Sequence, residues 1–186
     1  LAVSGALATT AGAITTNGFP DNGRHPNVGA ILVPERSGVG YAEVCSGTLV
    51  SPTLFLTASH CTAFLDSDPR PEFVTFDETM VEDNPTGLIE VMEVHTNTSY
   101  KRGYRDDVSL LEFETPVTGI TPAKLPPLGY LDTVGLKQST KMTVVGYGTR
   151  EQEVVKGEGP TFPFEGSREY AVGSFNALTP QWLKMS

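Results

Sequence analysis

Hydrophobic positions along the chain occur in short runs rather than in long periodic stretches. Runs rich in Val, Ile, Leu, Phe and Thr are separated by turn residues, a pattern typical of β-sandwiches and β-barrels. Helical periodicity is weak: a short helical turn is expected to begin within 57–61, and 181–186 is too short to assign. The strands predicted from these runs are 28–33, 43–50, 54–57, 73–76, 88–95, 108–113, 141–147 and 168–175.

A stretch dense in proline and glycine separates the sixth predicted strand from the seventh. Such a density prevents continuous strand pairing and favours an extended connector. A domain boundary is therefore expected within 116–140, between a first unit at 14–115 and a second at 141–186. The residues concerned are Pro116, Gly119, Pro122, Pro126, Pro127, Gly129 and Gly135.

Composition and charge are consistent with an ordinary globular protein rich in turns. The 186 residues are 39% hydrophobic and include 19 Gly and 14 Pro, which suits an all-β architecture. The formal net charge of −9 argues against nucleic acid and anionic membranes as partners, since both are bound mainly through clustered Lys and Arg.

The first thirteen residues predict a secretory origin. Residues 1–13 carry no charge, are mostly small or apolar, and end in Ala-Gly-Ala, the small-x-small pattern that signal peptidase reads. They are interpreted as the remnant of a signal peptide on a secreted, extracellular protein. The sequence contains no run of 18 apolar residues, the pattern that would predict a transmembrane anchor.

Two segments carry the strongest chemical signal: Thr-Ala-Ser-His-Cys at 57–61 and Cys-Ser-Gly-Thr-Leu at 45–49. They resemble the histidine region of the trypsin/chymotrypsin-like serine proteases. Asp-Asp-Val-Ser-Leu-Leu at 106–111 resembles the strand that carries the family's buried aspartate, and Val-Gly-Tyr-Gly-Thr at 145–149 resembles its Gly-Trp-Gly turn. Ile-Thr-Thr-Asn-Gly at 14–18 stands where the family has its mature N-terminus.

The resemblance implies a double β-barrel, with the first barrel complete in 14–115 and the second incomplete in 141–186. It also implies peptide-bond hydrolysis, with a polypeptide substrate, a monomeric protein, and neither cofactor nor metal. His60 would be the general base, and Cys45 and Cys61 would form a disulfide that anchors it. Such an anchor matters because a general base works only within hydrogen-bond reach of the proton it takes.

Asp107 is the candidate carboxylate that orients His60. It stands immediately before an apolar run that would be buried, and it lies 47 residues after His60. Successive residues of a strand face opposite sides, so only one of Asp106 and Asp107 can address the histidine. The alternative is that both are solvated loop residues.

No candidate nucleophile is found. The family's serine lies in Gly-Asp-Ser-Gly-Gly-Pro, and this segment does not occur in the 186 residues. Ser46 and Ser59 lie near the histidine motif, but neither is flanked by the glycines of a tight turn. The chain is therefore interpreted as a fragment that would not turn over substrate by itself.

Other histidines and other functions remain open alternatives. His95 resembles a strand-end histidine without a catalytic role, and His25 precedes Pro26 in an entry loop. A zinc site from Cys45, His60 and Cys61 is disfavoured, because the paired ligand spacing of zinc sites is missing.

The rival functions are a non-catalytic homologue that acts as a binding module, and a structural β-domain with a chance motif. Asn-Thr-Ser at 97–99 is a glycosylation sequon.

Overall fold

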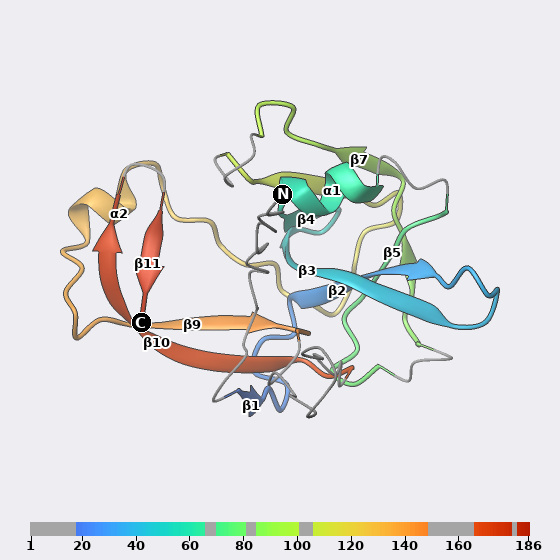
Figure 1. Ribbon diagram of the computed structural model, residues 1–186, viewed down its shortest axis with the longest axis horizontal. Helices are drawn as coiled ribbons and strands as arrows, with labels where there is room; N and C mark the ends of the chain where they lie inside the picture. Colours follow the sequence, from blue (N-terminus) through green and yellow to red (C-terminus); the bar gives the residue numbers. More distant parts are fainter. Residues whose placement is uncertain (1–17, 66–69, 81–84, 101–105, 149–165, 180–181) are drawn as a thin grey trace, which may run out of the picture.

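The computed structural model describes residues 18–65, 70–80, 85–100, 106–148, 166–179 and 182–186. Strands dominate, and they form two antiparallel sheets with two short helices (Figure 1). The all-β prediction is confirmed. In chain order the elements are β1 (Phe19–Pro20), β2 (Val28–Pro34), β3 (Tyr41–Ser51), β4 (Leu54–Thr57), α1 (Ser59–Leu65), β5 (Phe73–Thr75), β6 (Ile89–Glu90), β7 (Glu93–His95), β8 (Ser109–Glu112), α2 (Tyr130–Thr133), β9 (Lys141–Gly146), β10 (Glu169–Leu178) and β11 (Leu183–Met185).

The larger sheet closes into a barrel. Its strand order is β6-β5-β2-β3-β4-β8-β7, so β6 and β7 lie at its two edges. Only Val91 and Met92 separate these strands along the chain, and their amides donate to the carbonyls of Glu72 and Glu112. The polypeptide therefore passes directly from one edge to the other, and a closed barrel leaves no long unpaired edge.

Phe55 belongs to the barrel core and is fully buried. Its ring is accommodated because Gly47 and Gly29 carry no side chain: a Cβ on Gly47 would lie 2.3 Å from the Phe55 ring, and one on Gly29 would lie 3.1 Å from it. The other buried residues of this core are Ile31, Val33, Leu49, Leu65, Val74, Val91, Leu111 and Phe113.

The smaller sheet is built around β10. Strand β9 pairs with residues 169–174 of β10, β11 pairs with its last part, and β1 pairs with Tyr170 and Glu169. The sheet is open, and several large apolar side chains on it and on its connections are 37–51% exposed: Val144, Val172, Leu178, Trp182 and Leu183. The segment 116–140 crosses between the two sheets without forming a strand, and α2 lies within it (Figure 1).

A buried polar network joins the two sheets. Arg168 is 3% exposed and donates through Nε to Oδ2 of Asp21 at 2.9 Å, and through Nη1 to the hydroxyl of Tyr147 at 3.0 Å. The Tyr147 hydroxyl in turn donates to the carbonyl of Asp77 at 2.6 Å. These bonds connect the start of β10 and the end of β9 with the entry to the barrel.

Most of the strands predicted from the hydrophobic pattern are present, with ends that differ from the prediction by at most three residues. The exception is the predicted strand 88–95, which is divided into β6 and β7 where the barrel closes. Strands β1 and β11 and helix α2 were not predicted. The proposed signal remnant, 1–13, lies outside the described residues.

Candidate functional site

His60 lies in the first turn of α1, directly after β4. The helix buries Cys61, Thr62 and Leu65 against the barrel, a spacing that places them on one helical face. Its start is fixed to the barrel: Thr57 Oγ1 donates to the Ser46 carbonyl at 3.1 Å, and the Ser59 hydroxyl donates to the Val108 carbonyl at 2.9 Å. The short helix therefore has a rigid support under the histidine.

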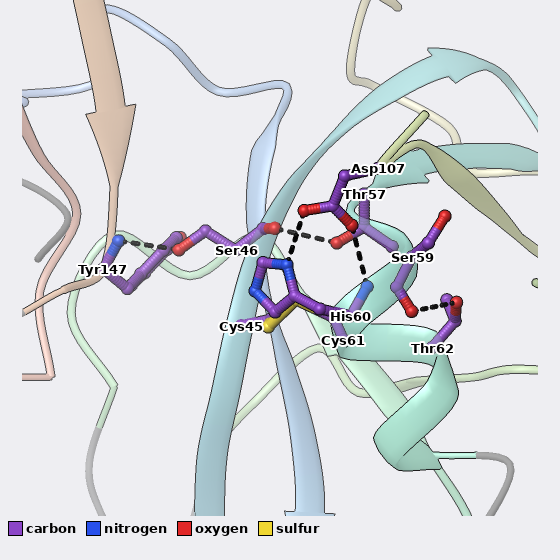
Figure 2. The surroundings of a disulfide bond; sticks show 9 residues. All are labelled: Cys45, Ser46, Thr57, Ser59, His60, Cys61, Thr62, Asp107 and Tyr147. Atoms are coloured by element: carbon purple, nitrogen blue, oxygen red, sulfur yellow. Dashed lines mark hydrogen bonds and ion pairs between the residues drawn. A yellow bond between two sulfur atoms is a disulfide. The ribbon is translucent and has the colours of Figure 1, made fainter. Parts of the chain in front are cut away.

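His60 and Asp107 form a pair with two contacts (Figure 2). His60 Nδ1 lies 2.8 Å from Asp107 Oδ2, and the backbone N–H of His60 donates to Oδ1 at 2.9 Å. The carboxylate side chain is 13% exposed and the imidazole 45% exposed. One aspartate thus holds both the ring and the backbone of the histidine.

This geometry fixes the tautomer of the neutral imidazole. An ionised carboxylate only accepts hydrogen bonds, so Nδ1 carries the proton and donates it to Asp107. Nε2 is then the basic nitrogen, on the ring edge opposite the aspartate. The arrangement can therefore take a proton at Nε2 and stabilise the resulting imidazolium through Asp107.

The turn before β8 sets the direction of Asp107. Asp106 has a left-handed backbone, with φ of 55°, and its carbonyl accepts hydrogen bonds from Asn97 Nδ2 and from the Val108 N–H, each at 2.9 Å. Asp107 lies outside β8, which begins at Ser109. The backbone of Asp106 thus shapes the turn, while the side chain of Asp107 reaches His60.

A disulfide links Cys45 of β3 to Cys61 of α1, with Cα atoms 6.3 Å apart (Figure 2). This confirms the predicted pair. The bond joins the residue next to His60 to the strand on which the helix rests. The disulfide also excludes a metal site formed by Cys45, His60 and Cys61, because sulfurs bonded to each other offer no thiolate ligand.

The two serines of the motif are occupied by structural hydrogen bonds. Ser46 turns away from His60, and its Oγ accepts the Tyr147 N–H at 2.9 Å (Figure 2). Ser59 is fully buried, and its Oγ also lies 2.8 Å from the Ser109 hydroxyl. Both hydroxyl groups thus form hydrogen bonds with residues other than His60.

The remaining histidines lie in other environments. His25 Nδ1 contacts Oδ1 of the buried Asp21 at 2.5 Å, so this residue is part of the network between the sheets. His95 is the last residue of β7 and lies 2.9 Å from Glu112. Sequence reasoning missed the Asp21 network entirely, since its members are far apart along the chain and no local motif marks them.

Two further observations concern the molecule as a whole. A surface groove of about 910 Å³ is lined by 76–77, 87–92, 114–118 and Ile120, and it does not include His60 or Asp107. Within the described part of the chain, neither helix has the length or the apolar composition needed to cross a bilayer.

Comparison with known proteins relates this chain to one family by sequence and by fold. The family model Trypsin matches residues 20–160. A protein named "Trypsin" from Saccharopolyspora erythraea is 29% identical over 129 residues, which cover 69% of this chain and 52% of that protein. The solved structure of HL collagenase superimposes with a TM-score of 0.61 and 18% identity, over 86% of this chain and 62% of that chain.

The class defined by fold and sequence is that of the trypsin-like double-barrel proteins. The chain belongs to the trypsin family of serine proteases. It spans about half the length of the Saccharopolyspora erythraea protein.

Proposed function

We propose that this chain is the N-terminal part of a secreted serine endopeptidase. The observation that carries the proposal is the pair of contacts from Asp107 to His60, combined with an imidazole that is 45% exposed. A general base must be held in one orientation and yet reach its substrate, and this pair meets both conditions.

In the proposed reaction His60 acts first as a base and then as an acid. Nε2 takes the proton of a serine hydroxyl while the serine oxygen attacks the peptide carbonyl, and Nε2 later gives that proton to the leaving amine. Asp107 keeps the proton on Nδ1 and stabilises the imidazolium between the two steps. No metal or organic cofactor takes part in this scheme.

The nucleophile is proposed to lie in polypeptide that follows residue 186. This is supported by the absence of Gly-Asp-Ser-Gly-Gly from the sequence and by the structural bonds of Ser46 and Ser59. The proposed organisation is a signal remnant at 1–13, a complete barrel at 14–115, a linker at 116–140 and a partial second barrel at 141–186. The 186 residues alone should then be inactive, and a monomer is expected.

Cleavage after Ala13 is proposed to release Ile14 as the mature N-terminus. The supporting pattern is Ala-Gly-Ala at 11–13. The residue before Ile14 is alanine rather than arginine or lysine, so signal peptidase would generate this terminus without a separate activation cleavage. Mass spectrometry of secreted material should find Ile14 first, and a different first residue would contradict this part of the proposal.

The test of the reaction compares three variants of a longer protein that carries the serine motif. His60→Ala should lower kcat by about 10⁴ to 10⁶, because the members of a triad act as a unit. Asp107→Asn should lower it by about 10⁴, because the imidazole takes the wrong tautomer. Asp106→Asn is the matched control and should retain most activity, since its side chain is not part of the pair.

A serine-directed phosphonylating reagent supplies a second measurement. It should label the longer protein and leave the 186-residue chain unlabelled. Equal losses in the two aspartate variants would overturn the role of Asp107, and hydrolysis by the 186-residue chain that depends on His60 would overturn the proposed organisation.

The rival function is a non-catalytic homologue that only binds a partner. It is favoured by the one observation that the hydroxyl groups of Ser46 and Ser59 are hydrogen-bonded to residues other than His60. An in-frame stop directly after residue 186 would support it, whereas a Gly-Asp-Ser-Gly-Gly segment in the continuing reading frame would support the peptidase.

A further inference from the structure

A second group of ionisable side chains lies on the outer face of the barrel, on the β7–β8 pair. Glu93 and His95 are two residues apart on β7 and therefore share a face. Glu93 is paired directly with Glu112 of β8, while His95 is paired with Leu110. The backbone register alone thus gathers one imidazole and two carboxylates at this place.

The imidazole lies between the two carboxylates. His95 Nε2 is 2.9 Å from Glu112 Oε2, and His95 Nδ1 is 3.7 Å from Glu93 Oε1. One ligand atom from each of the three residues lies within 4.8 Å of the others. In a tetrahedral zinc site with bonds of about 2.0–2.2 Å, neighbouring ligand atoms are about 3.3–3.6 Å apart. The two carboxylates contact different ring nitrogens, so one of these partly exposed glutamate side chains must rotate for all three ligand atoms to surround one ion.

The charge arrangement favours a cation at this place. Glu93 and Glu112 are directly opposite across the strand pair, and like charges in this position destabilise a sheet. Within the part of the chain that the structure describes, no lysine or arginine forms an ion pair with either carboxylate, and His95 is the group in contact with both. A divalent ion would neutralise the pair more completely than a singly charged imidazolium.

We propose that Glu93, His95 and Glu112 form a binding site for a divalent transition-metal ion of the zinc class. An imidazole with two carboxylates suits Zn²⁺ or Co²⁺, whereas Ca²⁺ takes oxygen ligands only. Three protein ligands leave a fourth position for water. The ion would cross-link β7 to β8, and the turn that holds Asp107 follows directly: Asn97, two residues after His95, donates to the carbonyl of Asp106.

Zinc titration of the complete 186-residue chain, followed by NMR of the histidine rings, tests this site directly. The chain has three histidines, so each ring can be assigned. Zn²⁺ should shift the His95 signals with one-to-one stoichiometry and raise Tm, and Ca²⁺ should do neither. Zinc that leaves His95 unchanged at millimolar concentration, or that shifts only His60 or His25, would overturn the proposal.

Variants separate this site from other ligands. His95→Asn should abolish the effect, and Glu93→Gln and Glu112→Gln should each weaken zinc binding by about tenfold or more. Glu90→Gln, a nearby exposed glutamate on β6, and His60→Ala, which removes the other exposed histidine, should bind zinc as the unmodified chain does. Unchanged affinity in His95→Asn would refute the assignment. The test requires no peptidase activity, so its outcome is independent of the proposed function.

Discussion

Loss of the ion pair between Asp21 and Arg168 should destabilise the protein strongly. Asp21 is fully buried and Arg168 is 3% exposed. Asp21→Asn preserves the size of the side chain but leaves the guanidinium without a counter-ion. The cost of removing one partner of a buried pair is about 3–5 kcal/mol.

The Arg168 guanidinium cannot avoid this loss of stability by rotating into water, because other hydrogen bonds hold it in place. Its Nη1 also donates to the carbonyls of Val28 and Phe76 and to the hydroxyl of Tyr147, at 3.0–3.1 Å. For a protein of this size, each kcal/mol lowers Tm by about 2–4 °C, so a loss of about 6–20 °C is expected. Urea unfolding of Asp21→Asn, of Arg168→Met and of the double variant measures the effect.

The double variant should lose less stability than the sum of the two single variants, because neither buried charge is left alone. A change of less than about 1 kcal/mol in Asp21→Asn would refute the reasoning, since it would mean that the pair is not desolvated.

The pH dependence gives an independent check. Burial favours the neutral form of Asp21, but the hydrogen bonds from His25 and Arg168 and the charge of Arg168 outweigh it and hold the pKa below its ordinary value of 3.8. A lowered folded-state pKa stabilises the protein fully above the unfolded-state value, and this contribution is lost as the pH falls through the folded-state pKa. The stability difference between the unmodified chain and Asp21→Asn should therefore shrink only below about pH 4.

Three further predictions concern stability and are measured by urea unfolding. Removing the disulfide with Cys45→Ser and Cys61→Ser should cost about 3 kcal/mol, because it closes a loop of 16 residues; an unchanged midpoint would argue against a structural role. Burial raises the pKa of Glu43 to about 7, so stability should fall as the pH rises from about 4.5 to 7. Glu43→Gln should then be more stable than the unmodified chain at pH 8, by roughly 1–3 kcal/mol, and should match it near pH 4.5. Gly47→Ala should cost about 1–3 kcal/mol or more, because the new Cβ would lie 2.5 Å from the Leu56 carbonyl; a neutral result would contradict the close packing at Phe55.

The barrel strands could be predicted because their apolar residues serve a single core. Strand β4 was predicted with its observed ends, and its two inward-facing residues, Phe55 and Thr57, are buried. The run 88–95 was predicted as one strand because its composition is continuous. Closure of the barrel divides it, since Val91 and Met92 bond to Glu72 and Glu112 on different neighbouring segments. Closure is a property of the whole sheet, so no local pattern marks it.

The junction between the sheets could not be predicted. Strand β1 has two residues, one of them a proline without an N–H, and it pairs with residues about 150 positions later. Asp21 and Arg168 are 147 residues apart, and charged residues are ordinarily expected at the surface. Burial of such a pair depends on a tertiary contact that neither local sequence reveals.

Asp107, and not Asp106, contacts His60, and the physical reason differs from the one that the sequence suggests. Strand alternation does not apply, because both aspartates precede β8. The left-handed conformation of Asp106 turns the chain there, and hydrogen bonds to its carbonyl from Asn97 and Val108 hold that conformation. The motif therefore located the carboxylate to within one residue. The direction of the Asp107 side chain depends on the turn at Asp106. Asn97, nine residues before Asp106, holds this turn, so the direction also depends on how β7 is packed against β8.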